Sequence, residues 1–174
     1  IGNLQEIHNW SNRPVWPQGT GAVLGLDGVS RVVVAEIGHR MVDWNRRYFA
    51  PFNGSAVDDP RVEVVVDDVA RVVADQTDVY DMVLLDVDNG PGWLAAPGNA
   101  EIYCPKGLER CRQALRPGGV LAIWSPSRNR TLESSLTEVF PDFEVVDTTS
   151  IGRELDEPGM IIYLTGSAPR NVPG

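Results

Sequence analysis

The chain has 174 residues and a formal charge of −9 at pH 7, and its 43% hydrophobic and 22% charged residues are ordinary for a folded globular domain. The excess of acidic residues argues against the clustered basic surface that a nucleic-acid backbone or an anionic membrane requires, so we expect neither partner. No apolar run approaches the length of a membrane span and no signal-peptide pattern opens the chain, which predicts a cytoplasmic protein.

The first 18 residues predict irregular chain, because they show no period and contain Pro14 and Pro17, which oppose a helix. A glycine-rich stretch follows at residues 19–28. It is either a nucleotide-type loop leading into a short helix or a plain turn, because the apolar strand that should precede such a loop is not recognisable. We therefore expect an atypical first strand and glycine loop, with Gly19 and Gly21 as candidate cofactor-binding residues.

Three strongly apolar or β-branched runs end in acidic residues, as buried strands do where they reach the open edge of a parallel sheet. The runs are residues 31–37, 61–66 and 82–85, and the acids at their ends are Glu36, Asp67 with Asp68, and Asp86. Ligands of open α/β sheets bind at that edge. We expect these strand ends to lie side by side, so that the carboxylates cluster on one rim suited to hydroxyls, amines or positive charge.

Helical and turn patterns separate the strands. Helices are predicted at residues 40–49, 69–74, 102–115 and 131–140, and the first of them is amphipathic, with Met41, Trp44, Tyr48 and Phe49 as its apolar positions. A further strand is predicted at residues 120–124, after a Pro-Gly-Gly turn, and residues 143–148 and 160–165 are predicted to pair antiparallel. This alternation predicts an α/β fold, a Rossmann-like, mostly parallel sheet with helices on both faces and a C-terminal antiparallel strand pair.

The cysteines and histidines predict neither a disulfide nor a metal site. Cys104 and Cys111 lie seven positions apart on a predicted helix, too far apart for a disulfide, so we expect free thiols. His8 and His39 have no cysteine or carboxylate at ligand spacing, and no metal is expected.

Several segments together resemble the spermidine synthase-like, or aminopropyltransferase-like, branch of the class I S-adenosylmethionine-dependent methyltransferase superfamily. They are Val32–Glu36, Val42–Arg46, Asp59–Val64, Tyr80–Pro91 and Leu115–Leu121. The Leu-Arg-Pro-Gly-Gly turn is shared by the whole superfamily, whereas the block from Asp86 to Pro91 is more specific to this branch. The resemblance covers roughly residues 19 to 165. We therefore expect an irregular segment at 1–18, the domain at 19–166 and a tail at 167–174.

The resemblance implies a cofactor-binding segment and a ribose-binding acid. Glu36 would bind the ribose hydroxyls of a nucleoside, and Asp68 would lie near the adenine amino group. Asp67 and Val69 flank Asp68 and are further candidates. Here the sequence departs from the family pattern, because Asp67 and Asp68 stand where a Gly-Asp pair is usual.

The resemblance also implies the catalytic and substrate-contacting residues. Asp86 would match the acid that accepts a proton from the attacking amine, because an ammonium is not a nucleophile and needs an adjacent base. The family's second acid position holds Asn89, with Asp88 beside it as a second catalytic candidate. Asn89, Trp93 in the following Pro/Gly-rich loop, and Tyr103 are the candidate substrate contacts; Trp93 either covers a ligand or only packs.

These observations predict a transferase that uses a nucleoside-sulfonium donor, S-adenosylmethionine or its decarboxylated form, with an amine or other small molecule as acceptor. Family likeness favours a homodimer. Two alternatives stay open. One is a non-catalytic descendant of the fold that acts as a binding or interaction protein; the other is a small-molecule methyltransferase that uses the same Glu36 and Asp68.

Overall fold

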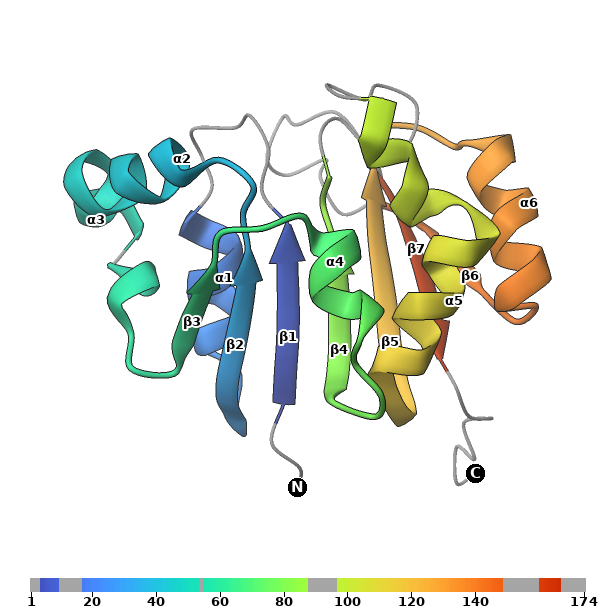
Figure 1. Cartoon of the computed structure of the whole chain (residues 1–174), viewed down its shortest axis with the longest axis horizontal. Coiled ribbons are helices and arrows are strands. Elements are labelled where there is room, and N and C mark those ends of the chain that lie inside the picture. Colours follow the sequence, from blue (N-terminus) through green and yellow to red (C-terminus); the bar gives the residue numbers. More distant parts are fainter. Residues whose placement is uncertain (1–3, 10–16, 54, 88–96, 149–159, 167–174) are drawn as a thin grey trace.

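The structure is a computed structural model that describes residues 4–9, 17–53, 55–87, 97–148 and 160–166 (Figure 1). Its elements are, in chain order, β1 (Leu4–Asn9), α1 (Pro17–Leu24), β2 (Val29–Ala35), α2 (His39–Trp44), η1 (Asn45–Phe49), α3 (Ala50–Asn53), η2 (Ala56–Asp58), β3 (Val62–Val65), α4 (Val69–Ala74), β4 (Tyr80–Leu85), η3 (Pro97–Tyr103), α5 (Pro105–Ala114), β5 (Leu115–Ser125), α6 (Arg130–Val139), β6 (Glu144–Asp147) and β7 (Ile161–Gly166). None of the helices in these ranges is long and apolar enough to cross a membrane.

Seven strands form one sheet in the order β3-β2-β1-β4-β5-β7-β6 (Figure 1). Strands β1 to β5 pair in parallel. Strand β7 runs antiparallel to both β5 and β6, so the predicted C-terminal antiparallel pair is confirmed. A mostly parallel sheet of this kind needs helices on its faces to cover its apolar side chains.

Both faces of the sheet are covered, as predicted. Along β2, Val33 and Ala35 belong to a hydrophobic core shared with α4, α5 and α6, whereas Val32 and Val34 belong to a second core shared with α1. Successive side chains of a strand point to opposite faces, so this division places helices on both sides. Val32, Val34 and Ala35 are 0% exposed, which explains why the strand reads as a continuous apolar run rather than an alternating one.

The expectation of irregular chain at residues 1–18 is wrong for the part that the structure describes. Strand β1 lies within the sheet and pairs in parallel with β2 on one side and β4 on the other. Pairing on both edges satisfies its backbone groups, which outweighs the weak strand propensity of its polar residues. Pro17 begins α1 instead of preventing it, because the missing N–H of proline costs nothing in the first turn of a helix. The sheet therefore extends N-terminal of the boundary predicted at residue 19.

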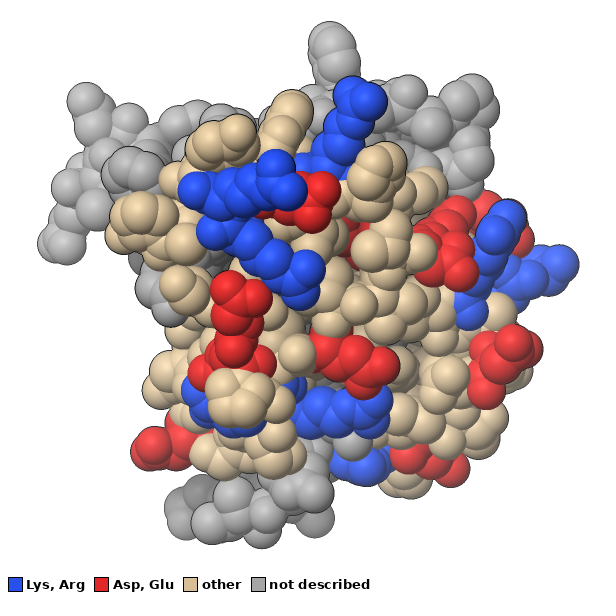
Figure 2. Space-filling model, turned by 60° about the vertical axis from the view of Figure 1, so that its left-hand side comes forward, with Lys and Arg blue, Asp and Glu red and all other residues tan. Residues whose placement is uncertain are grey.

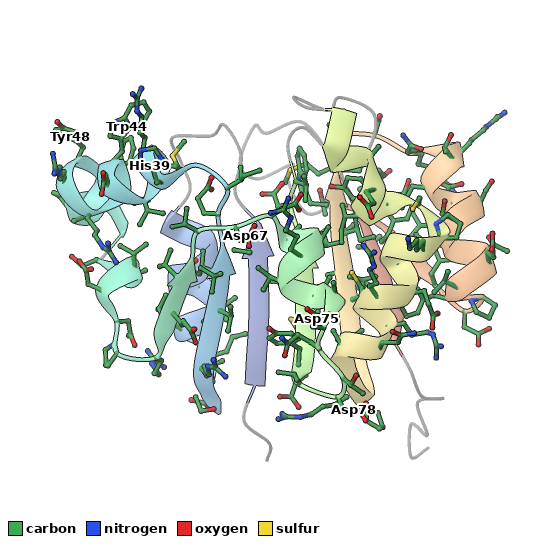
Figure 3. All side chains as sticks on the ribbon, viewed as in Figure 1. His39, Trp44, Tyr48, Asp67, Asp75 and Asp78 are labelled. Atoms are coloured by element: carbon green, nitrogen blue, oxygen red, sulfur yellow. The ribbon has the colours of Figure 1, made fainter. Side chains whose placement is uncertain are left out.

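The predicted helix at residues 40–49 is also different in detail. It begins as α2 and continues as the wider π-helical turn η1, and its expected apolar positions Trp44 and Tyr48 are 48% and 62% exposed (Figure 3). Hydrogen bonds to the fifth residue along, rather than the fourth, rotate the side chains of η1, Tyr48 among them, off the stripe that a regular helix would bury. The buried positions here are instead Val42 and Asn45, and Nδ2 of Asn45 donates to the Met41 carbonyl at 2.9 Å.

The predicted helix at residues 102–115 is divided. Residues Pro97–Tyr103 form the 3₁₀ turn η3, α5 starts at Pro105, and Leu115 already belongs to β5. Cys104 is the residue that precedes α5, and both cysteines are free thiols, as expected.

Candidate functional site

The acids predicted to form a rim share the carboxyl-terminal edge of the sheet but are not all side by side. Glu36 follows β2, Asp67 and Asp68 follow the neighbouring β3, and Asp86 follows β4. Strand β1 lies between β2 and β4, so Asp86 is two strands away from Glu36, roughly 10 Å at the usual strand spacing. The missed strand thus opens a gap between the candidate ribose-binding acid and the candidate base. Figure 3 shows Asp67 at this edge and Asp75 and Asp78 toward the opposite end.

Glu36 is the most unusual side chain of this edge, because it is a carboxylate only 3% exposed. Its Oε1 accepts a hydrogen bond of 2.6 Å from the backbone N–H of Gly38. Its Oε2 is buried and has no hydrogen-bond partner among the described residues. Burial raises the pKa of Glu36 from 4.5 to about 7, with the Gly38 hydrogen bond acting in the opposite direction. A buried acceptor without a donor is costly, so the site is suited to a ligand that supplies one.

Gly38 makes the close approach of the Glu36 carboxylate possible. It is the residue preceding α2, with extended backbone angles (φ −96°, ψ 94°). A Cβ at this position would lie 3.0 Å from Oε1 of Glu36, closer than side chains normally come. The absence of a side chain therefore lets the backbone N–H of Gly38 reach the carboxylate.

Asp67 and Asp68 shape the turn from β3 into α4. Asp68 is the N-cap of α4, and its Oδ1 accepts from the backbone N–H of Ala70 at 2.8 Å. Asp67 Oδ1 accepts from the backbone N–H of Asp68 at 2.7 Å and lies 3.7 Å from Nη1 of Arg71. Val69 is 1% exposed, so only its backbone is available to a ligand. One carboxylate oxygen of each aspartate is thus used in holding the turn.

Two exposed apolar residues at this edge were not selected from the sequence. Ile37 is 63% exposed and Val66 is 52% exposed, and each immediately follows the strand or strand-end acid of β2 and β3. Large exposed apolar side chains beside a buried acceptor fit the contact surface of a flat heterocycle. Their position directly at the ends of two neighbouring strands is the sequence feature that could have identified them.

The other candidate residues are placed unevenly. Tyr103 is buried, and its hydroxyl donates to the Val87 carbonyl at 3.2 Å, so it holds the backbone that follows Asp86 instead of presenting a free hydroxyl. Gly19 and Gly21 lie inside α1, which corrects the expected glycine loop; the connection from β1 to α1, residues 10–16, lies outside the described residues. The candidates Asp88, Asn89 and Trp93 also lie outside them.

The fold and this edge together define a class I methyltransferase-like domain, in which a parallel sheet carries a buried acid after its second strand. The chain belongs to the spermine/spermidine synthase domain family, whose profile matches residues 20–139.

The matched curated relatives are polyamine aminopropyltransferases. The chain is 30% identical over 105 residues to polyamine aminopropyltransferase 2 of Pseudomonas aeruginosa, a match that covers 58% of this chain and 28% of that protein. It is 29% identical over 125 residues to the polyamine aminopropyltransferase of Nitrosomonas europaea, covering 68% of this chain and 37% of that protein. The chain thus spans about a third of the length of these relatives.

Solved structures show the same fold. A spermidine synthase in complex with the transition state analogue AdoDATO superposes with a TM-score of 0.76 at 18% identity, over 95% of this chain and 55% of that one. Human methyltransferase-like protein 13 in complex with SAH superposes with a TM-score of 0.71 at 17% identity, over 97% of this chain and 74% of that one.

Proposed function

We propose that this chain is the nucleoside-binding and catalytic domain of a spermidine synthase-like transferase that moves an aminopropyl group from decarboxylated S-adenosylmethionine to an amine. The observation that carries the proposal is the buried Glu36 carboxylate, whose Oε2 has no hydrogen-bond partner among the described residues. Family membership and the names of the curated relatives support the same reading.

The described residues fit the nucleoside part of such a donor. Glu36 would accept hydrogen bonds from the ribose hydroxyls, held in place by the Gly38 N–H. Ile37 and Val66 would contact the faces of the base, and the second oxygen of Asp68 would accept from the adenine amino group. The donor supplies a carbon activated by an adjacent sulfonium.

Asp86 is the proposed base. The amine is positively charged in water and must lose a proton before its nitrogen lone pair can form a bond to carbon. Asp86 would hold the ammonium beside the donor and take that proton as the new C–N bond forms and the C–S bond breaks, with the bonding pair passing to sulfur. Its distance from Glu36, across β1, is in keeping with a donor whose ribose and reactive carbon lie at two separate places along the edge.

The experiment that tests the proposal is calorimetric titration with S-adenosylmethionine, its decarboxylated form and methylthioadenosine. Preference for the decarboxylated form supports it. Asp86→Asn should abolish aminopropyl transfer while changing the affinity for methylthioadenosine less than about twofold, since the base does not contact the nucleoside. Absence of heat with all three ligands would instead indicate a non-catalytic descendant of the fold.

A small-molecule methyltransferase is the second candidate. It is favoured by the superposition on the SAH-bound human protein, because this chain covers 74% of that structure and only 55% of the spermidine synthase. Tighter binding of S-adenosylmethionine than of its decarboxylated form, with methyl transfer to an added acceptor, would decide for this activity.

Assembly and location belong to the same proposal. We expect a homodimer in the cytoplasm, on the strength of the family resemblance. Light scattering on the protein as it elutes from a size-exclusion column should then give twice the chain mass of 19.1 kDa.

A further inference from the structure

Glu36 has an environment that disfavours its charged form. The side chain is 3% exposed, and one backbone N–H, that of Gly38, is its only hydrogen-bond donor in the part of the chain that the structure describes. No described arginine, lysine or histidine forms an ion pair with it. A carboxylate so enclosed and so poorly compensated binds a proton more tightly than one in water.

The elements next to Glu36 contain more acids than bases in their sequence. The titratable or charged residues of the flanking segments are Glu6 and His8 in β1, His39, Arg40 and Asp43 in α2, Asp67 and Asp68 after β3, and Asp86 after β4. The two causes acting on the pKa of Glu36 are burial, which raises it, and the Gly38 hydrogen bond, which lowers it. With a pKa of about 7, the carboxyl of the free protein is about half protonated at neutral pH.

We propose that binding of an adenine nucleoside at Glu36 releases one proton from the Glu36 carboxyl to solvent, so that uptake of the nucleoside tightens as the pH rises through neutrality. The inference rests on the proposed function, because the ribose hydroxyls are the donors. Two vicinal hydroxyls donate to the ionised carboxylate, whereas the neutral acid has one oxygen committed to its own proton. The ligand thereby supplies the donors that the free site lacks, and the O–H bond of the acid breaks as they arrive.

The size of the effect follows from proton linkage. Below the pKa of Glu36 in the free protein, the carboxyl is mostly protonated and must lose its proton when the nucleoside binds. Each further pH unit below that pKa therefore raises the dissociation constant of the nucleoside about tenfold. The dissociation constant should therefore be about tenfold lower at about pH 8.5 than at about pH 6. At the lower pH about 0.9 proton should leave per nucleoside bound, and at the higher pH almost none.

Calorimetric titration with methylthioadenosine tests the proposal. This nucleoside is uncharged over the range used, so any proton exchanged comes from the protein. Titrations at about pH 6 in two buffers of unlike ionisation enthalpy should give different heats, whose difference reports the number of protons released. Glu36→Gln should bind more weakly, with the same heat in both buffers and no dependence on pH. Glu63→Gln, the same change at an exposed site in β3, should behave as the wild type does.

Two outcomes separate this inference from the proposed function. If methylthioadenosine binds with equal heats in both buffers and constant affinity, proton release is wrong and the nucleoside site stands. If no adenine nucleoside binds at any pH, both fail. A carbon-13 NMR titration of the Glu36 carboxyl in the free protein needs no ligand, and a midpoint near the ordinary value for glutamate would overturn the inference by itself.

Discussion

At the scale of single residues, the candidate site is a compromise between stability and binding. The buried Glu36 lacks donors for one oxygen in the part of the chain described, and its burial raises its pKa to about 7. Such a group weakens the folded state, and its presence is explained if a ligand completes it. The sequence predicted Glu36 as a site residue because it ends an apolar run. It could not predict that the acid is buried, because burial depends on tertiary contacts.

The stability of the protein should therefore improve when the charge of Glu36 is removed. The folded pKa, about 7, is above the ordinary 4.5, so the folded state holds more protons between these values and its free energy of unfolding falls as the pH rises through them. Glu36→Gln should be roughly 3 kcal/mol more stable than the wild type at about pH 8 and similar to it below about pH 4.5. Urea unfolding at the two pH values measures this, with Glu63→Gln as the matched control. Equal stabilities at the higher pH would show that Glu36 is compensated.

Gly38 offers a test of geometry without a change of charge. In Gly38→Ala the new Cβ would lie 3.0 Å from Oε1 of Glu36 and would move the carboxylate away from the backbone N–H. We expect about a tenfold loss of affinity for methylthioadenosine with a loss of stability under about 1 kcal/mol. Gly166→Ala is the control, because a Cβ there meets no atom of the described residues within 4 Å. Unchanged affinity in Gly38→Ala would mean that this carboxylate does not contact the nucleoside.

At the scale of elements, the sequence predicted the strands that are rich in apolar or β-branched residues and missed the one made mostly of polar residues. Strands β2 and β4 contain runs such as Val32–Ala35 and Met82–Leu85, which have few other interpretations. Strand β1, Leu-Gln-Glu-Ile-His-Asn, has two apolar residues in six and is fixed by its two neighbours. Because β1 was missed, the acids after β2 and β4 were expected side by side, and Gly19 and Gly21 were placed in a loop instead of a helix.

The contribution of the Asp68 helix cap to stability can be separated from that of its charge. Asp68→Ala removes the acceptor for the Ala70 N–H and should cost about 1 kcal/mol of stability. Asp68→Asn caps a helix about as well as aspartate does, so its stability should stay within about 0.5 kcal/mol of the wild type. Thermal unfolding compares the two variants. If the asparagine variant is as unstable as the alanine variant, the charge of Asp68 and not its cap supports this turn.

The packing of α5 on η3 depends on a position without a side chain. A Cβ at Gly107 would lie 2.2 Å from the carbonyl oxygen of Glu101 and 2.6 Å from that of Ile102, so the backbones must separate to admit one. Gly107→Ala should therefore cost about 2–3 kcal/mol of unfolding free energy, which is typical of overpacking. The Gly166→Ala variant again controls for the loss of glycine. A Gly107→Ala protein of normal stability would show that η3 does not pack as described.

At the scale of the whole molecule, the excess of acidic residues sets the electrostatic field. The net charge is −9. On the face shown in Figure 2, acidic and basic side chains are interspersed. Arginines of β2 and of the segments between β2 and β3 are paired with acids, as in Arg31 with Glu63, Arg46 with Asp58 and Arg61 with Asp59. Ion pairs carry no net charge, so the net charge of −9 sets the long-range field, which attracts cations.

That field should act on the amine and not on the nucleoside. If the acceptor is a dicationic amine, raising NaCl from about 20 mM to about 500 mM shortens the Debye length from roughly 20 Å to roughly 4 Å and should raise the KM for the amine several-fold with kcat little changed. Methylthioadenosine is uncharged, so its dissociation constant should change less than about twofold over the same range. Initial rates at saturating donor, with the nucleoside titrated in parallel, measure both quantities. A KM for the amine that is insensitive to salt would mean that the amine is recognised by short-range contacts alone. An equal change in the dissociation constant of the nucleoside would point to an effect of salt on the fold, because only a charged ligand responds to the field itself.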